Sequence, residues 1–144
     1  MDRAQNLLGA SSIQEAQVDQ WLIFGQLNLA PHFRSVLGPI FGWMEVTAAA
    51  NAEGQKAVKD HVRTVNNALE GREWLVGESV TLADYALAAL FMMYAQTILE
   101  KNYRKSVPHF SAWFERVAAD AHFIKQFGKV HMCEKSVKGT AIKK

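Results

Sequence analysis

Few residues in this chain could do chemistry, and their spacing decides what that chemistry could be. The candidate metal ligands are His32, His61, His109, His122 and His131, with Cys133 as the only thiol. A zinc site needs closely spaced ligands, such as two histidines four residues apart on one helix. No two of these histidines have that spacing. We therefore interpret them as surface or packing residues and expect no bound metal.

Two further groups invite a catalytic interpretation. Cys133 lies between Lys129 and Lys135, and neighbouring cations can lower the pKa of a thiol and make it reactive. It is, however, the only cysteine, so no second thiol could resolve an oxidised form. Asp84 follows Thr81 by three residues, the spacing of a helix capping box, which explains the aspartate without catalysis. The scattered glycines form no phosphate loop, and we expect no catalytic residue and no cofactor.

The charge of the chain is unevenly placed. Its 144 residues suit one domain with an ordinary globular composition, 49% hydrophobic and 21% charged. Residues 134–144 carry four lysines against one glutamate, a balance of +3 within a total of +2, which leaves −1 for residues 1–133. A nucleic-acid-binding domain gathers its cations on one folded face. We therefore expect no direct contact with nucleic acid.

The sequence also bears on location. A single cysteine excludes an intrachain disulfide and suits a reducing compartment. No apolar stretch of sufficient length follows Arg3, so we expect no signal peptide. The most apolar run, residues 85–94, is about half of the ~20 residues that a bilayer requires. These features predict a cytoplasmic protein without membrane contact.

The elements that must position these residues are helices. Ser12 and Glu15 have capping-box spacing and predict the start of the first helix, which Pro31 should end. A second helix is expected over residues 39–50, with a break near 51–54. Helical spacing predicts two core stripes, formed in the first helix by Ile13, Ala16, Phe24 and Leu27, and in the helix ending at residue 69 by Val58, Val62, Val65 and Leu69.

The strongest local signal lies at residues 80–85. Thr81 and Asp84 can form a capping box, and Val80 and Tyr85 occupy the positions of a hydrophobic staple. The helix that follows, about 81–99, is apolar on nearly all sides, which is typical of a buried central helix. Further helices are expected from Pro108 and over residues 121–127. No alternating run is long enough for a strand, so the sequence predicts an all-α fold.

These pieces together resemble one family. Residues 74–84, Trp-Leu-Val-Gly-Glu-Ser-Val-Thr-Leu-Ala-Asp, resemble the segment that enters the central helix of the glutathione S-transferase C-terminal domain. Residues 16–21 and 108–113 are similar to its first helix and to the helix after the central one. The resemblance implies a multi-helix orthogonal bundle over residues 1–133, followed by a basic tail or the start of a linker at 134–144.

A narrower similarity is to the gamma-subunit family of eukaryotic translation elongation factor 1. It rests on residues 16–18, 20–21, 98–100, 103–104, 113–114 and, most specifically, Cys133-Glu134-Lys135. This resemblance implies a non-catalytic scaffold domain of the nucleotide-exchange complex in protein synthesis. Its partners would be the other subunits of that complex, with a homodimer as a further form.

Two alternatives stay open. The glutathione-binding, thioredoxin-like lobe of the transferase family has no counterpart in these residues. The chain could be the substrate-side lobe of a thiol transferase, active only with that lobe, or a docking domain of a tRNA-synthetase complex. An apolar cleft for a transferase substrate, or simply a core stripe, would be formed by Tyr85, Phe91, Met92, Met93 and Tyr94.

A docking surface has its own candidates, in the stretch between the first two long helices. These residues are too apolar for a solvated connector, and aromatic and methionine side chains are favoured in interface cores. The candidate interface residues are Phe33, Ile40, Phe41, Trp43 and Met44.

Overall fold

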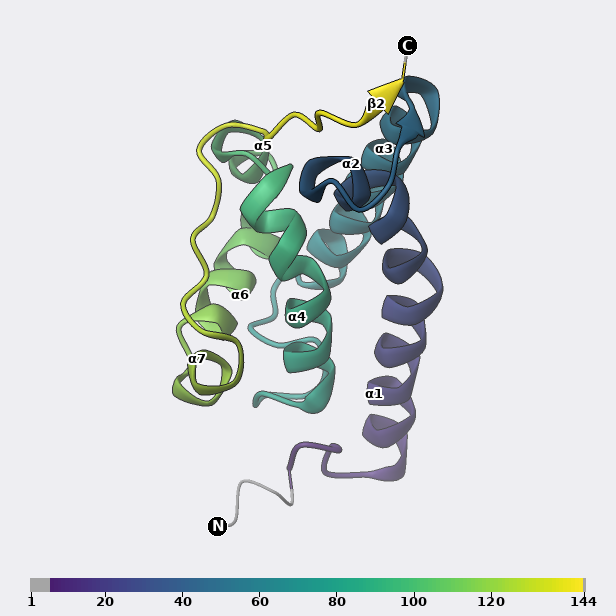
Figure 1. Ribbon diagram of the computed structural model, residues 1–144. Helices are drawn as coiled ribbons and strands as arrows, with labels where there is room; N and C mark the ends of the chain where they lie inside the picture. The colour runs from purple at the N-terminus through teal and green to yellow at the C-terminus, as the bar shows by residue number, and fades with distance from the viewer. Residues whose placement is uncertain (1–5, 144) are drawn as a thin grey trace.

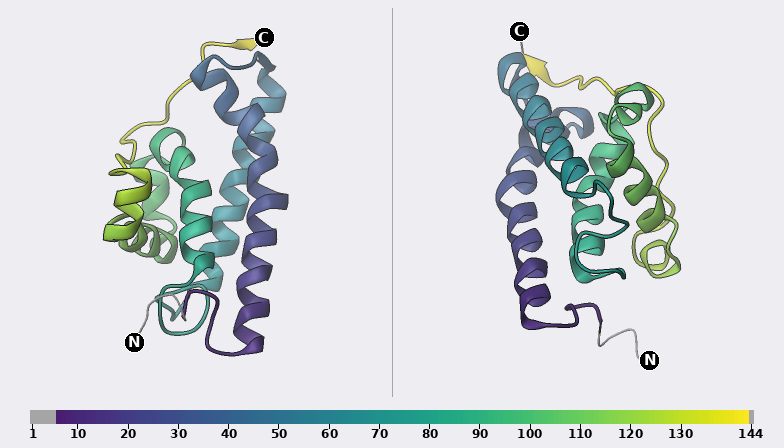
Figure 2. Two further views of the ribbon diagram at one scale, coloured as in Figure 1. Left: turned by 60° about the horizontal axis from the view of Figure 1, so that its bottom comes forward. Right: turned by 180° about the vertical axis from the view of Figure 1, so that it is seen from behind.

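Helices account for most of residues 6–143, the part of the chain that this computed structural model describes (Figure 1). Helix α4 packs against α1 on one side and α6 on the other, while α3 packs against α6 and the turns that follow α1 (Figures 1 and 2). The prediction of an all-α bundle with a buried central helix is confirmed. The helices are α1 (Ser12–Phe24), α2 (Gly38–Phe41), α3 (Ala48–Ala68), α4 (Leu82–Thr97), α5 (Lys101–Lys105), α6 (Pro108–Ala118) and α7 (Ala121–Phe127).

The central helix α4 begins where the sequence predicts and ends two residues earlier. Thr81 is its N-cap, with extended backbone, and the hydrogen bonds of the predicted capping box are present. Ala83, Leu87, Phe91 and Ala95, each four residues from the last, are almost completely buried. That spacing fixes one side of α4 in the core.

The start of α1 differs from the prediction by one residue. Ser11, not Ser12, is the N-cap, and its hydroxyl accepts from the Gln14 N–H at 3.3 Å. The Ala10 N–H in turn donates to Gln14 Oε1 at 2.8 Å. Both serines precede a residue of the Glu/Gln type by three positions, so spacing alone could not choose between them.

The predicted core stripe of α1 is confirmed only at Phe24, which packs against the core; its other three residues are exposed. Ile13 is 72% exposed and Leu27 is 70% exposed, whereas Val18, Gly25 and Leu29 face the core. Close approach to α4 explains this choice, because a Cβ at position 25 would lie 2.6 Å from Leu90 Cδ1. The glycine therefore turns this side of the helix inward.

Pro31 does not end the helical path, contrary to the prediction. The chain continues through a π turn (Gly25–Leu29), a 3-10 turn (Ala30–His32) and a second π turn (Phe33–Leu37) into α2. The wider π turns and the tighter 3-10 turn shift the pattern of backbone hydrogen bonds. No bond of that pattern therefore requires the N–H that Pro31 lacks.

The helix predicted over residues 39–50, with a break near 51–54, is also wrong. Helix α2 ends at Phe41, and α3 runs without interruption from Ala48. Asn51 is buried and donates through Nδ2 to the Ser35 carbonyl at 2.8 Å, so it packs α3 against the turns before α2. The predicted valine stripe of α3, together with Leu69, is fully buried and confirmed.

After α7 the chain runs back across the molecule as an extended segment, which we call the C-terminal strap (residues 128–143; yellow in Figure 1). It ends in β2 (Ile142–Lys143), which pairs in parallel with β1 (Val46–Thr47). The prediction of no strand is wrong at this place. Strands of two residues are too short to leave an alternating pattern in the sequence.

Candidate docking surface

The most exposed aromatic side chains of the described residues form a pair at the corner between α2 and β1. Phe41 is 46% exposed and Trp43 is 65% exposed. Their rings are stacked, with centroids 4.9 Å apart and planes 20° from parallel. Gly42 between them ends α2 in the left-handed conformation, with φ of 73°, which residues with a Cβ rarely adopt. We call Phe41 and Trp43 the corner stack.

The other predicted interface residues are less exposed than the corner stack. Phe33 packs on the ring of Tyr94 at a centroid distance of 5.4 Å and belongs to the edge of the core. Ile40 is also partly buried against the core, and Met44 is half-buried. The predicted set therefore divides into an exposed pair and three less exposed residues.

A second exposed apolar surface lies along α1 and continues into the π turn that follows it. Ile23 is 57% exposed and lies, by helical spacing, on the same side as Ile13 and Leu27. We call these three residues the α1 stripe. This surface was not predicted from the sequence, because Ile13 and Leu27 were expected in the core. The signal that could have found it is the more regular series Val18, Trp21, Leu22, Gly25 and Leu29, all buried or partly buried.

The predicted apolar cleft does not lie open. Phe91 and Tyr94 are fully buried, and Phe91 meets the edge of Phe110 at a centroid distance of 4.9 Å. Tyr94 donates its hydroxyl to the Leu29 carbonyl at 2.9 Å, and burial raises the pKa of this phenol. Tyr85, Met92 and Met93 are partly buried against the same core. These side chains fill the core around α4.

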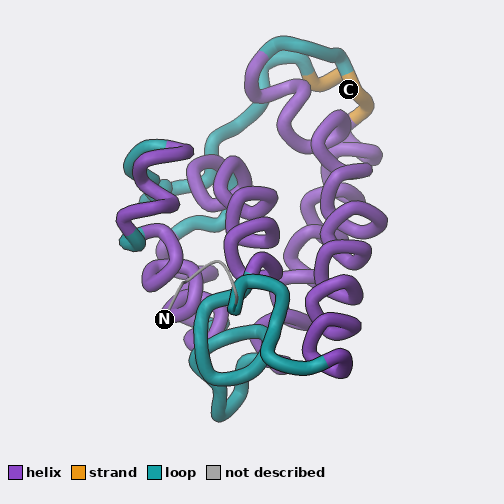
Figure 3. The backbone as a smooth tube through the Cα atoms, turned by 90° about the horizontal axis from the view of Figure 1, so that it is seen from below, coloured by secondary structure: helices purple, strands orange, loops and turns teal. Residues whose placement is uncertain are grey.

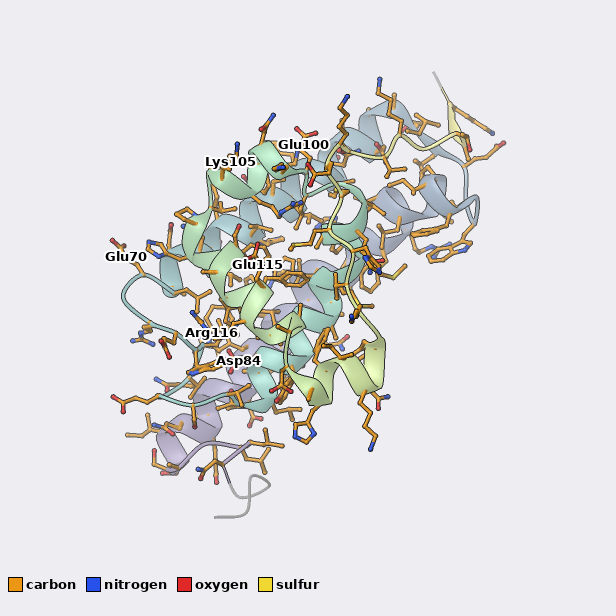
Figure 4. The ribbon with its side chains drawn as sticks, turned by 90° about the vertical axis from the view of Figure 1, so that its left-hand side faces the viewer. Glu70, Asp84, Glu100, Lys105, Glu115 and Arg116 are labelled. Atoms are coloured by element: carbon orange, nitrogen blue, oxygen red, sulfur yellow. The ribbon has the colours of Figure 1, made fainter. Side chains whose placement is uncertain are left out.

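The Asp84 side chain, labelled in Figure 4, accepts four hydrogen bonds. Its Oδ1 accepts from the Leu75 N–H at 3.0 Å and from Trp113 Nε1 at 2.8 Å. Its Oδ2 accepts from the N–H of Thr81 at 2.8 Å and from the hydroxyl of Thr81 at 3.1 Å. The side chain is fully buried. These four bonds join α4, α6 and the loop before α4, and they leave Asp84 a structural role.

The staple positions flank this network. Val80 is half-buried, and Tyr85 donates its hydroxyl to Asp120 Oδ1 at 3.1 Å. Asp120 is itself the N-cap of α7, accepting from the N–H groups of His122 and Phe123. Tyr85 therefore ties the start of α4 to the start of α7.

The histidines and the cysteine offer little chemistry. His32 and His61, which sequence spacing did not connect, lie with ring centroids 6.0 Å apart, and burial, with the charge of His32, lowers the pKa of His61. Within residues 6–143, no group of three or more His, Cys, Asp and Glu residues could hold a metal ion. Burial raises the pKa of the Cys133 thiol despite Arg104, which opposes the reactive-thiol interpretation.

One pocket with a polar lining has a volume of about 970 Å³. It lies between the start of α1 and the loops at the end of the bundle seen in Figure 3. Arg72, Glu73 and Glu78 line it, so its charges are of mixed sign and select no single class of ligand. None of the helices in the described part of the chain is long and apolar enough to cross a membrane.

Known proteins match this fold and its sequence. The family model "Glutathione S-transferase, C-terminal domain" matches residues 26–121. The chain belongs to this family. Among solved structures, it is similar to the GST-like domain of elongation factor 1-gamma from Saccharomyces cerevisiae, with a TM-score of 0.84 and 22% identity, covering 92% of this chain and 62% of that one.

Curated relatives are longer proteins. The chain is 33% identical over 128 residues to valine–tRNA ligase of Takifugu rubripes, covering 89% of this chain and 10% of the ligase. It is 30% identical over 129 residues to elongation factor 1-gamma of Carassius auratus, covering 90% of this chain and 29% of that protein. The elongation factor 1-gamma of Artemia salina is 26% identical, with 92% and 31% covered. The chain thus spans a third or less of each relative.

Proposed function

We propose that this chain is a non-catalytic docking domain that works in translation, in the manner of the elongation factor 1-gamma proteins that it resembles. The observation that carries the proposal is the corner stack. Two large aromatic rings are stacked on each other and exposed to solvent, while Asp84, the only buried carboxylate described, is fully bonded within the fold. Such a molecule offers contact area, not bond chemistry.

In this proposal, the domain binds its partner by burying apolar surface between the two proteins. Tryptophan is among the residues most often found to dominate binding energy at interfaces, and loss of such a residue costs about 2 kcal/mol or more. Trp43 is backed by Phe41, so it needs little ordering when a partner covers it. Pre-organised rings of this kind bind at a low cost in conformational entropy.

The partners we propose are the nucleotide-exchange subunits of the elongation factor 1 complex in the cytoplasm. Several relatives are elongation factor 1-gamma proteins, matched over about nine-tenths of this chain. The α1 stripe supports a homodimer as an additional form. Ile13 and Leu27 lie seven residues to either side of Gln20, so two antiparallel copies of α1 would bring Ile13 of one copy opposite Leu27 of the other.

A second candidate is a docking domain of a tRNA-synthetase assembly. The specific observation in its favour is the 33% identity to valine–tRNA ligase, in which the matched stretch is 10% of a much longer protein. The physical mode of docking would be the same and the partner would differ.

Affinity purification from the source cells, with the bound subunits identified by mass spectrometry, tests both candidates. We expect the wild-type chain to retain the nucleotide-exchange subunits and Trp43→Ala to lose them. Glu115→Ala, which changes an exposed residue of α6, is the matched control. Retention of synthetases in place of exchange subunits would favour the second candidate. Equal retention by Trp43→Ala and wild type would contradict docking through the corner stack.

The thiol-transferase alternative is tested on a longer parent chain. If this domain were the substrate-side lobe of a transferase, the parent would bind glutathione resin and conjugate an electrophile such as chlorodinitrobenzene. We expect neither activity. The burial of Phe91 and Tyr94 supports this expectation, because neither ring is available to line a substrate cleft.

A further inference from the structure

The C-terminal strap is bonded to the end of the central helix. The N–H of Cys133 donates to the Ala95 carbonyl at 3.0 Å, and the N–H of Val137 donates to the Thr97 carbonyl at 2.7 Å. The last carbonyls of a helix have no partner within it, so these two bonds complete the end of α4. Arg104 adds a bridge, donating to the carbonyls of Leu99 and Cys133.

The strap is also held where it passes α5. The Ser136 N–H donates to Glu100 Oε2 at 3.2 Å, and Figure 4 shows Glu100 where the strap passes this helix. Lys101 pairs with Glu134 at 3.0 Å, and its N–H donates to the Glu134 carbonyl at 3.4 Å. The strap therefore reaches the α2–β1 corner from a fixed starting point.

At the corner, the strap contacts the chain on both sides of the corner stack. Before the stack, Gly139 lies so close to Pro39 that an added Cβ would be 2.7 Å from the proline Cβ and 3.0 Å from its carbonyl carbon. After the stack, the Val46 N–H donates to the Ala141 carbonyl at 3.2 Å, β2 pairs with β1, and Lys143 pairs with Glu45 at 2.6 Å.

We infer that the strap is a positioning element of the docking surface: it fixes residues 39–47 from both ends and so holds Phe41 and Trp43 in the arrangement that a partner contacts. This inference rests on the proposed docking function. It predicts a linkage, because a partner that binds the pinned corner also favours the docked strap, and a docked strap strengthens partner binding by the same factor.

The substitution that tests this in the full chain is Gly139→Ala. Its added Cβ cannot fit against Pro39, whose ring and backbone cannot yield as a flexible side chain would. Lys138→Ala is the matched control, because Lys138 is the adjacent strap residue and its side chain is exposed. Two quantities are measured for each variant: hydrogen exchange of the Val46 amide, and the affinity for a purified nucleotide-exchange subunit.

We expect Gly139→Ala to speed exchange at Val46 about tenfold, since its amide then opens to solvent more often. Affinity should fall by roughly tenfold as well, the factor expected if only about a tenth of the molecules keep the corner pinned. Lys138→Ala should match the wild type in both.

Two results would overturn the inference. One is unchanged exchange at Val46 in Gly139→Ala, since the strap would then not hold the corner. The other is faster exchange with unchanged affinity, while Trp43→Ala still abolishes binding; the proposed docking function would then stand without the strap. Wild-type affinity in Trp43→Ala would instead contradict the proposed function itself, while faster exchange at Val46 would still support the strap's hold on the corner.

Discussion

The start of α4 and the α2–β1 corner both place a tryptophan near a carboxylate, and they use the pair in opposite ways. Trp113 is 1% exposed and donates to Asp84, which accepts three further hydrogen bonds. Trp43 is 65% exposed, and the nearby Glu45 pairs with Lys143 on the surface. The first region joins three parts of the chain, whereas the second presents a ring to solvent.

The difference shows how to separate structural from functional residues in this fold. A buried carboxylate with every acceptor position used contributes to the free energy of unfolding and has nothing left to offer a ligand. An exposed ring contributes little to folding and gains most when another surface covers it. The two regions should therefore respond differently to mutation, and the following predictions test that difference.

The largest effect is expected at Asp84. Asp84→Ala leaves the N–H groups of Trp113, Leu75 and Thr81 buried without an acceptor, which should lower the free energy of unfolding by about 3–5 kcal/mol. Urea unfolding measures this. Glu115→Ala, at an exposed position of α6, should change it by less than about 0.5 kcal/mol. Equal losses of unfolding free energy in the two variants would contradict the structural role of Asp84.

A smaller effect is expected at Tyr94. Tyr94→Phe removes one hydroxyl and leaves the buried Leu29 carbonyl without the bond it receives at 2.9 Å. The cost should be about 1–2 kcal/mol, the range for a buried group left unsatisfied. Thermal unfolding measures this cost, with Phe41→Leu, at an exposed ring, as the control. A Tyr94→Phe variant as stable as the wild type would contradict a stabilising role for the Tyr94 hydroxyl.

Acid should weaken the fold through His61. Its pKa is lowered by burial and by His32, so between this lowered value and about pH 6.5 the unfolded state binds more protons than the folded state. Stability is fully present above the unfolded pKa and falls as the pH drops. We expect the melting temperature of His61→Gln to depend less on pH than that of the wild type. His131→Gln, at an exposed residue, should keep the wild-type dependence.

The smallest effect is expected at Lys143. Its ion pair with Glu45 joins two side chains that are 67% and 63% exposed, and water screens the attraction between charges this exposed. Lys143→Ala should leave the melting temperature nearly unchanged, whereas hydrogen exchange at Val46 should rise slightly. A large loss of stability would mean that the corner stabilises the fold, as the hydrogen bonds of Asp84 do.

The sequence predicted those parts of the fold whose cause is local. The capping box joins Thr81 and Asp84 over three residues, and the valine stripe of α3 repeats every three or four, so both could be read without knowledge of neighbours. The side of α1 that faces inward could not be predicted in this way, because it depends on how closely Gly25 approaches Leu90 across the bundle. The strap's pairing joins residues almost a hundred positions apart.

The candidate surface shows the same limit. The sequence predicted that the stretch containing Phe41 and Trp43 is too apolar to be a solvated connector. It could not divide that stretch, because the burial of Phe33 depends on Tyr94, 61 positions along the chain. It also missed the α1 stripe, which became visible only when the inward side of α1 was known.

The most direct test of the account is Trp43→Ala, measured for folding and for binding on the same protein. Calorimetric titration with a purified nucleotide-exchange subunit should show affinity reduced by about 2 kcal/mol or more, roughly thirtyfold. Urea unfolding should change by no more than about 0.5 kcal/mol. Unchanged affinity, or a loss of folding stability as large as that of Asp84→Ala, would contradict the claim that the corner stack is a docking surface.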